Sequence, residues 1–484
     1  MRTPIAALLL MVSAVLFAQE RPRSQPPSFA LTHVTVIDAT GAPARPDMTV
    51  VITGERITSI AESGQARIPH GARVVDATGK FLIPGLWDMH VHALWGGRAD
   101  TFLPLFIANG VTGVRDMGVG DIDGDLEVLD RVRKEAAQGT RVAPRIVASG
   151  PIVDGAKPIW PGSRAVKNAT EGRQAVDELQ KRGVDFIKVY VGLSRDAYFA
   201  IAGEAKARGI AFAGHVPAAI TATEASDAGQ RSIEHLSGVF LASSAKEAQA
   251  RARYAAAAVE PNASARARAV LEATSLALNS YSPGKGAAMF ARFVKNRTWQ
   301  CPTLTVLRAP AYLDDTILTG DWRLKYLPAA DVESWKPRGV PEAAQPRAEY
   351  FAIRKEIFQR QIELVKAMHQ AGVELLAGTD TPNPYCFPGF SLHDELALLV
   401  EAGLTPMEAL QAATRNPAKY LGLLDSLGTV EEHKIADLVL LGADPMEDIG
   451  NTRRIDAVVV GGRLISKSEL QAMLARVEAA VSGP

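Results

Sequence analysis

Cysteine is almost absent from this sequence, which has only Cys301 and Cys386 among its 484 residues. Two cysteines can form at most one bridge, so a disulfide framework cannot hold a chain of this length together. The fold must therefore rest on a hydrophobic core, and the hydrophobic content of 47% is ordinary for a soluble globular enzyme. We expect the two cysteines to lie close together in space, and a single bridge between them remains open.

An excess of charge of either sign is also lacking. Lys and Arg together number 53, and Asp and Glu together number 53. A balanced chain gives no electrostatic reason to expect binding to nucleic acid or to an anionic membrane surface. We therefore expect neither as a partner.

The apolar run at the N-terminus is too short to cross a bilayer. It covers residues 5–18, follows Arg2 and is interrupted by Ser13, as in the hydrophobic region of a secretory signal peptide. We interpret residues 1–18 as a signal peptide and the Pro-, Arg- and Ser-rich residues 19–28 as a disordered mature N-terminus. This predicts a secreted or periplasmic protein that no membrane holds after signal cleavage.

Short segments of β type occur near both ends of the chain. They are residues 31–37, 48–53, 56–60, 436–441 and 455–460. Neither end alone has enough strands to bury a face, so we expect one small β-sandwich domain built from residues 29–80 and 425–466. Residues 467–484 are expected to form a C-terminal helix.

Residues 81–424 alternate short apolar segments with helical ones. The segments that indicate strands are residues 81–88, 111–115, 145–148, 186–191, 211–215, 232–236, 298–304 and 374–378. Helical patterns lie at residues 126–138, 170–182, 195–208 and 353–370. This alternation predicts an α/β fold, a (β/α)8 TIM-like barrel. Two long inserts, residues 245–278 and 309–347, follow the sixth and seventh strands, where lids over a site would lie.

The first barrel strand ends in two histidines one residue apart, in residues 81–92 (FLIPGLWDMHVH). Successive strand residues point to opposite faces, so His90 and His92 project the same way and can hold one metal ion. Two solvated histidines in a loop are the alternative interpretation. The pair therefore needs support from the rest of the chain.

Four further positions with ligand chemistry fall at the ends of other expected strands: Lys188, His215, His235 and Asp380. Residues at the C-terminal ends of barrel strands converge on one mouth. Singly, each histidine could be a packed core residue and Asp380 a helix cap. A lysine buried in a strand is costly unless its charge is removed or paired, and taken together these positions predict a metal site.

The chain resembles the amidohydrolase superfamily over nearly its whole length after the expected signal peptide. The motifs that carry the resemblance are residues 84–92 (PGLWDMHVH), Lys188, His215, residues 233–235 (IEH), 378–380 (GTD), 416–423 (NPAKYLGL), 428–430 (GTV) and 436–440 (ADLVL). Within the superfamily the chain is similar to the imidazolonepropionase-like branch. It is more similar still to the binuclear members, which are metal-dependent Xaa-Pro and basic-residue dipeptidases and carboxypeptidases and ochratoxin-type amidases. Imidazolonepropionase itself is mononuclear and lacks such a lysine, so Lys188 favours the binuclear group.

The resemblance implies a cofactor of two divalent metal ions. The more buried ion would be bound by His90, His92 and Asp380. The other would be bound by His215 and His235, and N-carboxylated Lys188 would bridge the two. Carboxylation turns a buried cation into an anion with two oxygens. Neutral imidazoles with oxygen ligands suit zinc and similar ions.

The resemblance also implies hydrolysis of an amide or peptide-like C–N bond. A hydroxide that bridges the metals would attack the carbonyl carbon, and Asp380 would take its proton and deliver it to the leaving nitrogen. Tyr190 lies two residues from Lys188 and faces the same layer, so it is a candidate to assist the oxyanion. His393 and Tyr385, expected in the loop after the eighth strand, are further candidates. Each of the three could instead be plain packing or a helix cap.

Formal counting leaves such a site at about +1, which favours a substrate that carries or develops negative charge. With the resemblance, this predicts a small-molecule amide or dipeptide substrate that carries a carboxylate, N-acyl amino acids and ochratoxin-like amides among them. Arg98, Arg164 and Arg308 are candidate partners for that carboxylate. The same ligands would permit hydrolysis of a cyclic amide, a lactone or a phosphotriester. A non-catalytic assembly protein is the alternative of another class, but it would be expected to lack metal ligands, and all six are present. We also expect the protein to form a homo-oligomer.

Overall fold

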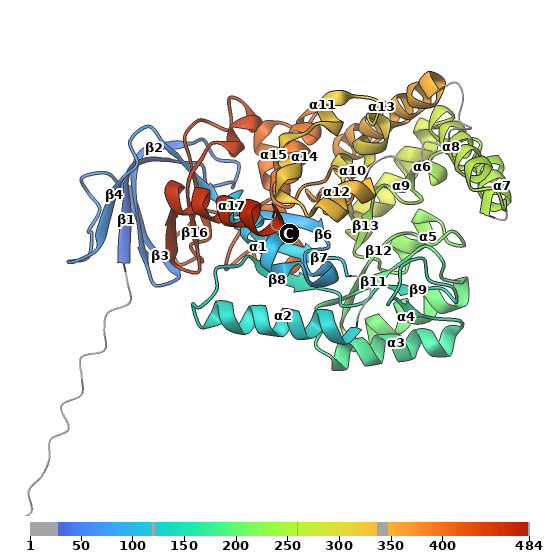
Figure 1. The fold of residues 1–484 in the computed structure, drawn as a ribbon, viewed down its shortest axis with the longest axis horizontal. Coiled ribbons are helices and arrows are strands. Elements are labelled where there is room, and N and C mark those ends of the chain that lie inside the picture. The colour runs from blue at the N-terminus through green and yellow to red at the C-terminus, as the bar shows by residue number, and fades with distance from the viewer. Residues whose placement is uncertain (1–27, 119–121, 259, 336–346, 483–484) are drawn as a thin grey trace, which may run out of the picture.

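The computed structural model describes residues 28–118, 122–258, 260–335 and 347–482. The expected signal peptide lies outside these ranges, as does the expected disordered segment except for Ser28, which begins the first strand. The described chain forms a β-sheet domain, on the left of Figure 1, beside a larger α/β body. No helix in these ranges is both long and apolar enough to cross a bilayer.

The β-sheet domain takes its strands from both chain ends, as expected. They are β1 (Ser28–Val36), β2 (Arg45–Thr53), β3 (Arg56–Glu62), β4 (Arg73–Asp76), β5 (Phe81–Pro84), β15 (Leu438–Leu441), β16 (Ile455–Val460) and β17 (Arg463–Ser466). Since β5 and β15 pair edge to edge, the strands form one continuous sheet, in the order β17-β16-β15-β5-β1-β2-β3 with β4 on β1. Along β15, Leu438 and Leu440 enter the core of this domain, whereas Val439 and Leu441 enter the core of the α/β body.

Seven parallel strands form most of a barrel. They are β6 (Leu86–Val91), β7 (Val111–Asp116), β8 (Arg145–Ala148), β11 (Phe186–Val189), β12 (Ala211–Gly214), β13 (Ser232–Glu234) and β14 (Trp299–Cys301). Neighbouring strands pair in two groups, β6 to β8 and β11 to β14. The amide of Asp185, just before β11, donates to the carbonyl of Ala148 at 2.8 Å and joins the two groups.

Residues 374–381 take the place of the eighth strand, where the sequence predicts it. Gln300 of β14 bridges in parallel to Leu375, and Val91 of β6 bridges in parallel to Thr381. The ring of strands therefore closes as a barrel. The carboxyl ends of its strands meet at one mouth, which is where such barrels place their sites.

The expected first strand, residues 81–88, is divided at Gly85 between the two domains. β5 pairs with β1 and β15 in the β-sheet domain, whereas β6 begins the barrel. Gly85 passes so close to Thr112 that a Cβ atom there would lie 2.1 Å from the threonine Oγ1. One apolar run thus supplies strands to two sheets, and only a glycine fits at the crossing.

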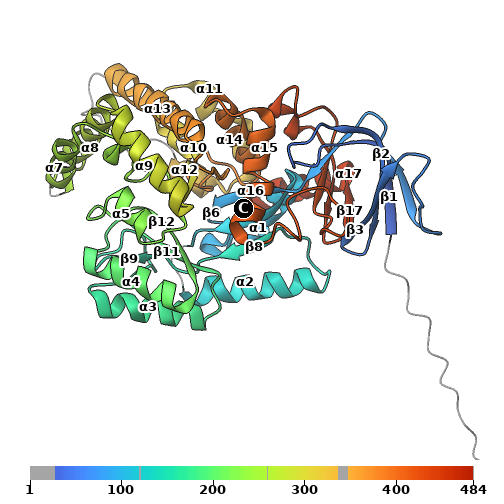
Figure 2. The ribbon, with the colours of Figure 1, turned by 180° about the vertical axis from the view of Figure 1, so that it is seen from behind.

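Helices cover the outside of the barrel, and Figure 2 shows α2, α3 and α4 along β8, β11 and β12. The helices around the barrel are α1 (Ala99–Ala108), α2 (Ile122–Ala137), α3 (Ala169–Lys181), α4 (Arg195–Arg208), α5 (Ala222–Asp227), α13 (Arg347–Gln370), α14 (Phe390–Glu401), α15 (Pro406–Ala412) and α16 (Arg415–Leu421). α4 begins where the Ser194 side chain accepts from the amide of Ala197, and it ends at Gly209 in the left-handed region. The four helices predicted between barrel strands are all present.

The described residues of both long inserts are largely helical. After β13 the chain forms α6 (Val239–Ala242), α7 (Glu247–Ala258), α8 (Ala263–Asn279) and α9 (Pro283–Asn296). After β14 it forms α10 (Leu304–Arg308), α11 (Thr316–Thr319) and α12 (Ala329–Trp335), and the chain ends in α17 (Lys467–Ser482). α7 and α8 pack side by side at the end of the molecule far from the β-sheet domain (Figure 1).

Candidate metal centre

The six predicted ligand residues meet at the mouth of the barrel, in a cavity of about 250 Å³. His90 lies in β6 and Lys188 in β11, and the others lie just beyond strand ends or in the eighth segment. The cavity is lined by His90, His92, Lys188, His215, His235 and Asp380 together with Trp95, Ile152, Trp160, Tyr190, Val306, Leu307 and Asn383. Residues far apart in the sequence thus form one site.

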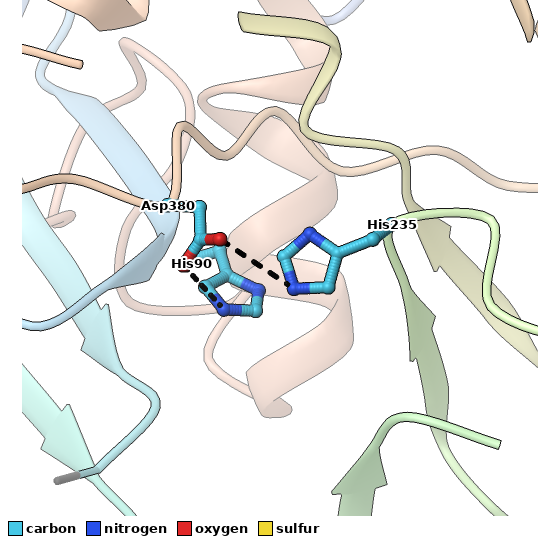
Figure 3. A group of neighbouring side chains, drawn as sticks. All are labelled: His90, His235 and Asp380. Carbon is cyan, nitrogen blue, oxygen red and sulfur yellow. Dashed lines mark ion pairs between the residues drawn. The ribbon is translucent and has the colours of Figure 1, made fainter. Parts of the chain in front are cut away.

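Asp380 lies at the centre of the histidines. Its carboxylate oxygens lie 3.2 Å from His90 Nε2, 3.0 Å from His92 Nε2 and 3.8 Å from His235 Nε2. Figure 3 shows the rings of His90 and His235 next to each other, each joined by a dashed line to this carboxylate. The ligand atoms of His90, His235 and Asp380 all lie within 4.8 Å of one another, so one cation could reach them together. Asp380 and His235 both have left-handed backbones, with φ of 61° and 57°, a strained conformation typical of functional sites.

Hydrogen bonds fix which nitrogen of each histidine faces this carboxylate. His90 Nδ1 lies 2.8 Å from Glu234 Oε2, and His92 Nδ1 lies 2.5 Å from the carbonyl oxygen of Gly118. A carboxylate and a carbonyl only accept, so both Nδ1 atoms carry the proton. Each Nε2 therefore presents a lone pair to the centre, as metal-ligating histidines do.

His235 is oriented in the same way through a hydroxyl group. Its Nδ1 lies 2.6 Å from Thr303 Oγ1, and that hydroxyl donates to the carbonyl of Pro302 at 2.7 Å. Since the hydroxyl proton is used there, Thr303 accepts from His235 Nδ1. The Nε2 lone pair of His235 is left for a cation.

Three buried nitrogens of the site have no hydrogen-bond partner among the described residues. They are Lys188 Nζ, His215 Nδ1 and His90 Nε2. Leaving a buried polar atom unpaired costs about 1–3 kcal/mol, and such atoms call for an explanation such as an ion. Three of them lining one cavity, with an ionised carboxylate between the histidines, fit a site built for divalent metal.

Burial lowers the pKa of three of the nitrogen ligands. It lowers the pKa of His235 to about 3 and that of His215 well below its usual range. It also lowers the pKa of Lys188 to about 8, so a fraction of this amine is unprotonated near neutral pH. Burial acts to raise the pKa of Asp380, but the neighbouring histidines outweigh it and hold that pKa well below its usual range. Asp380 is therefore an ionised carboxylate.

A buried ion pair behind the site was not predicted from the sequence. Arg115 Nη2 donates to both carboxylate oxygens of Glu234, at 3.0 and 2.9 Å, and both side chains are fully buried. Arg115 also donates to the carbonyl of Met89 and to the hydroxyls of Ser232 and Tyr420. Glu234 in turn holds His90, so the pair anchors a predicted ligand. The signal was a charged residue inside an apolar strand, the feature that identified Lys188.

The structure brings only Tyr190 of the three oxyanion candidates to the cavity. Its ring lies 4.3 Å from that of His215 between centroids, and its hydroxyl accepts from Trp160 Nε1 at 3.0 Å. Burial raises the pKa of Tyr190, which keeps the hydroxyl protonated. Tyr385 is buried against Trp335, with ring centroids 5.7 Å apart.

His393 lies outside the cavity, so the prediction of a catalytic role for it is wrong. It belongs to α14 rather than to the preceding loop. Its Nδ1 lies 2.9 Å from Thr452 Oγ1 and its Nε2 lies 3.1 Å from the carbonyl oxygen of Asn109. Burial lowers the pKa of His393 to about 3, so it is a neutral packing residue that joins α14 to the end of α1.

The three arginines suggested as partners of a substrate carboxylate each face an acidic residue of the protein instead. Arg98 pairs with Asp331, and Arg164 lies 3.0 Å from Glu178. Arg308 lies 3.8 Å from Asp394. None of them lines the cavity within the described ranges.

The two cysteines, Cys301 and Cys386, are buried and free, so no bridge joins them.

Comparisons with known proteins match the barrel and its sheet domain. The model of the Amidohydrolase family matches residues 81–465. An imidazolonepropionase of Pseudomonas putida (strain GB-1) is 24% identical over 435 residues, which are 84% of this chain and 90% of that protein. An imidazolonepropionase of Agrobacterium fabrum is 34% identical over 122 residues, but the match spans only 27% of that protein.

Solved structures resemble the whole described fold. Bottromycin amidohydrolase superposes with a TM-score of 0.72 at 24% identity, over 95% of this chain and 91% of that one. A putative prolidase from Bifidobacterium longum superposes with a TM-score of 0.65 at 24% identity, over 94% of this chain and 99% of that one. Ochratoxinase of A. niger superposes with a TM-score of 0.62 at 20% identity, over 91% and 96% of the two chains. At these identities the likeness establishes the fold.

Proposed function

Because the chain belongs to the amidohydrolase family and is accordingly a hydrolase acting on C–N bonds, we propose that it cleaves an amide or peptide bond in a small molecule with two bound divalent metal ions. The observation that carries this proposal is the set of three buried nitrogens that have no hydrogen-bond partner among the described residues, Lys188 Nζ, His215 Nδ1 and His90 Nε2, around the Asp380 carboxylate. Without bound cations these atoms would be left uncompensated.

The two ions would divide the six ligands between them. His90, His92 and Asp380 would hold one ion, since the Nε2 atoms of both histidines lie within 3.2 Å of Asp380 Oδ1. His215 and His235 would hold the other. N-carboxylated Lys188 would bridge the ions, and zinc is the metal that this mixture of imidazole and oxygen ligands suits best.

Ions held by these residues would supply Lewis acidity at the scissile carbonyl and at the attacking water. Asp380 receives the proton that the attacking water gives up as its oxygen bonds to the carbonyl carbon. Asp380 then delivers that proton to the nitrogen as the C–N bond breaks, which releases a carboxylate and an amine. Tyr190 donates its hydroxyl proton toward the carbonyl oxygen as negative charge develops there.

The substrate is proposed to be a small amide, a dipeptide or an N-acyl amino acid. The structural neighbours include a putative prolidase, an ochratoxinase and a Xaa-Pro dipeptidase, and the last of these by its name cleaves a dipeptide. A free carboxylate on the substrate would be attracted by the net positive charge of the metal-loaded site. Arg98, Arg164 and Arg308 each face an acidic residue of the protein, so the metal site and not these arginines would supply the attraction. We also propose export across a membrane, directed by residues 1–18, and assembly as a homo-oligomer.

Hydrolysis assays on the metal-loaded protein test the reaction class. We expect amides and dipeptides to be cleaved, activity to disappear with a chelator, and activity to return when zinc is restored. Matched lactones and phosphotriesters carry no C–N bond and are expected to react far more slowly. Turnover confined to lactones or phosphotriesters would overturn the proposal, and a protein that binds no metal would support a non-catalytic role.

A further inference from the structure

Two tryptophans from different loops form a corner at the metal centre. Trp95 follows β6, and Trp160 lies between the short strands β9 (Val153–Asp154) and β10 (Arg164–Ala165). Their ring centroids lie 5.4 Å apart at an interplanar angle of 80°. Trp95 also packs edge-on against His92, with centroids 6.3 Å apart. The corner is therefore continuous with a predicted ligand and borders the place where chemistry would occur.

The rest of the lining outside the ligand set is largely apolar. Ile152, Val306 and Leu307 contribute hydrocarbon surface. Among the described lining residues outside the ligand set, only Trp160, Trp95, Tyr190 and Asn383 carry polar side-chain atoms, and none carries a charge. Transfer of an apolar group from water into such a corner is favourable, and edge-to-face contact with the indoles makes it more favourable for a flat ring.

Trp160 also controls the hydroxyl of Tyr190. An indole N–H can only donate, so in the 3.0 Å contact Tyr190 is the acceptor. This is the one hydrogen bond recorded for the Tyr190 hydroxyl among the described residues, so it leaves the phenolic proton available to a ligand. The ring of Tyr190 packs against that of His215, with centroids 4.3 Å apart, and both residues line the cavity.

We propose that Trp160 is a specificity-determining and positioning residue: its ring selects amides that bear a flat apolar group beside the scissile bond, and its N–H turns the Tyr190 hydroxyl into a donor toward the substrate. The proposal deepens the function proposed above and rests on it. The two roles are separable, because phenylalanine keeps a ring but removes the N–H, whereas alanine removes both.

Equilibrium binding tests the selection without relying on turnover. The protein carries Asp380→Asn, which is expected to be inactive, and the probes are N-benzoylglycine against N-acetylglycine and N-acetylphenylalanine against N-acetylalanine. We expect the aromatic probe of at least one pair to bind about tenfold or more tightly than its small partner. Adding Trp160→Ala should remove that preference, and Trp160→Phe should keep most of it. Trp322→Ala, which truncates an exposed tryptophan outside the cavity, should leave it unchanged.

Kinetics on the active protein test the positioning role. We expect Trp160→Phe to lower kcat about tenfold or more while KM for the aromatic substrate changes little. We expect Tyr190→Phe to lower kcat similarly, and the double variant to be no slower than the slower single variant, since both remove one donor. Independent, multiplicative losses would overturn the positioning role.

Equal affinities within both pairs, or a preference that survives Trp160→Ala, would overturn the selection. If the binding preference holds while the metal-loaded protein cleaves no amide, the proposed function fails and the selection stands.

Discussion

Glu234 lies behind the metal centre, and replacing it with glutamine should weaken metal binding more than any surface change of the same kind. One Glu234 oxygen accepts from Arg115 and from His90 Nδ1, and the other accepts from Arg115 and from the Ser232 hydroxyl. A glutamine must place its NH₂ at one of these positions. At either position the NH₂ group would face donors that now bond to a carboxylate oxygen, and two donors cannot bond to each other. At least one buried donor is therefore left without an acceptor.

The size of the effect follows from this burial. Both side chains of the Arg115–Glu234 pair are 0% exposed, and breaking a buried pair from one side costs about 3–5 kcal/mol of unfolding free energy. His90 Nδ1 then faces either the NH₂ group or a neutral amide oxygen, which is a weaker acceptor than a carboxylate, and loss of such a partner lowers metal affinity about 10- to 100-fold. Glu234→Gln should therefore reduce both stability and metal affinity.

Glu224→Gln is a matched control, because Glu224 also pairs with an arginine but lies on the surface, 2.7 Å from Arg195. It caps α5 and is expected to cost about 1 kcal/mol without changing metal affinity. Competition with a chromogenic chelator measures the affinity of each variant, and urea unfolding of the metal-free proteins measures stability. If Glu234→Gln lowered stability but bound metal as the unaltered protein does, the orienting role of Glu234 would be refuted.

Asp380→Asn should keep the circular dichroism spectrum and abolish turnover, because an amide cannot carry the proton; near-normal turnover would remove Asp380 from the reaction. Burial raises the pKa of Glu395 from 4.5 to about 7, so the folded state holds this proton to higher pH than the unfolded state and loses stability as pH rises across that range. In Glu395→Gln, the free energy of unfolding of the metal-free protein, measured with urea, should fall less as pH rises. An unchanged dependence on pH would contradict this prediction. Gly378→Ala should cost about 1–3 kcal/mol by overpacking, since its Cβ would lie 2.5 Å from Cys301 Sγ. Adding Cys301→Ala should recover part of that loss, and a Gly378→Ala protein as stable as the original would contradict the close approach.

The sequence predicts the fold and the ligand positions because both follow from local pattern. Period-two strands and intervening helices indicate the barrel, and in such a barrel the ends of strands converge. A histidine or lysine at a strand end, such as His215 or Lys188, therefore carries positional information without any knowledge of its neighbours.

Contacts between distant residues could not be predicted in this way. His393 lies near the eighth segment in sequence, but its partner Thr452 is 59 residues away, and only the packing of α14 against the C-terminal region reveals it. Arg115 and Glu234 are separated by 119 residues and meet only because the barrel closes. The pairing of Arg98 with Asp331 has the same origin. Strand pattern does not specify which surface charges find partners.

The division of the first apolar run illustrates a middle case. Pro84 and Gly85 signal a bend in the sequence, yet the run alternates and reads as one strand. What ends β5 is its pairing with β15, more than 350 residues later in the chain, and the close approach of Gly85 to Thr112. The local signal was present, but its meaning depended on the other end of the chain.

Metal content per chain is the most direct test of the proposed two-metal site bridged by carboxylated Lys188. Protein loaded with zinc in the presence of bicarbonate should hold about two ions per chain by elemental analysis. Lys188→Ala should hold no more than about one under the same conditions, whereas Lys206→Ala, which truncates an exposed lysine of α4, should still hold two. Two ions retained by Lys188→Ala would contradict the bridging role.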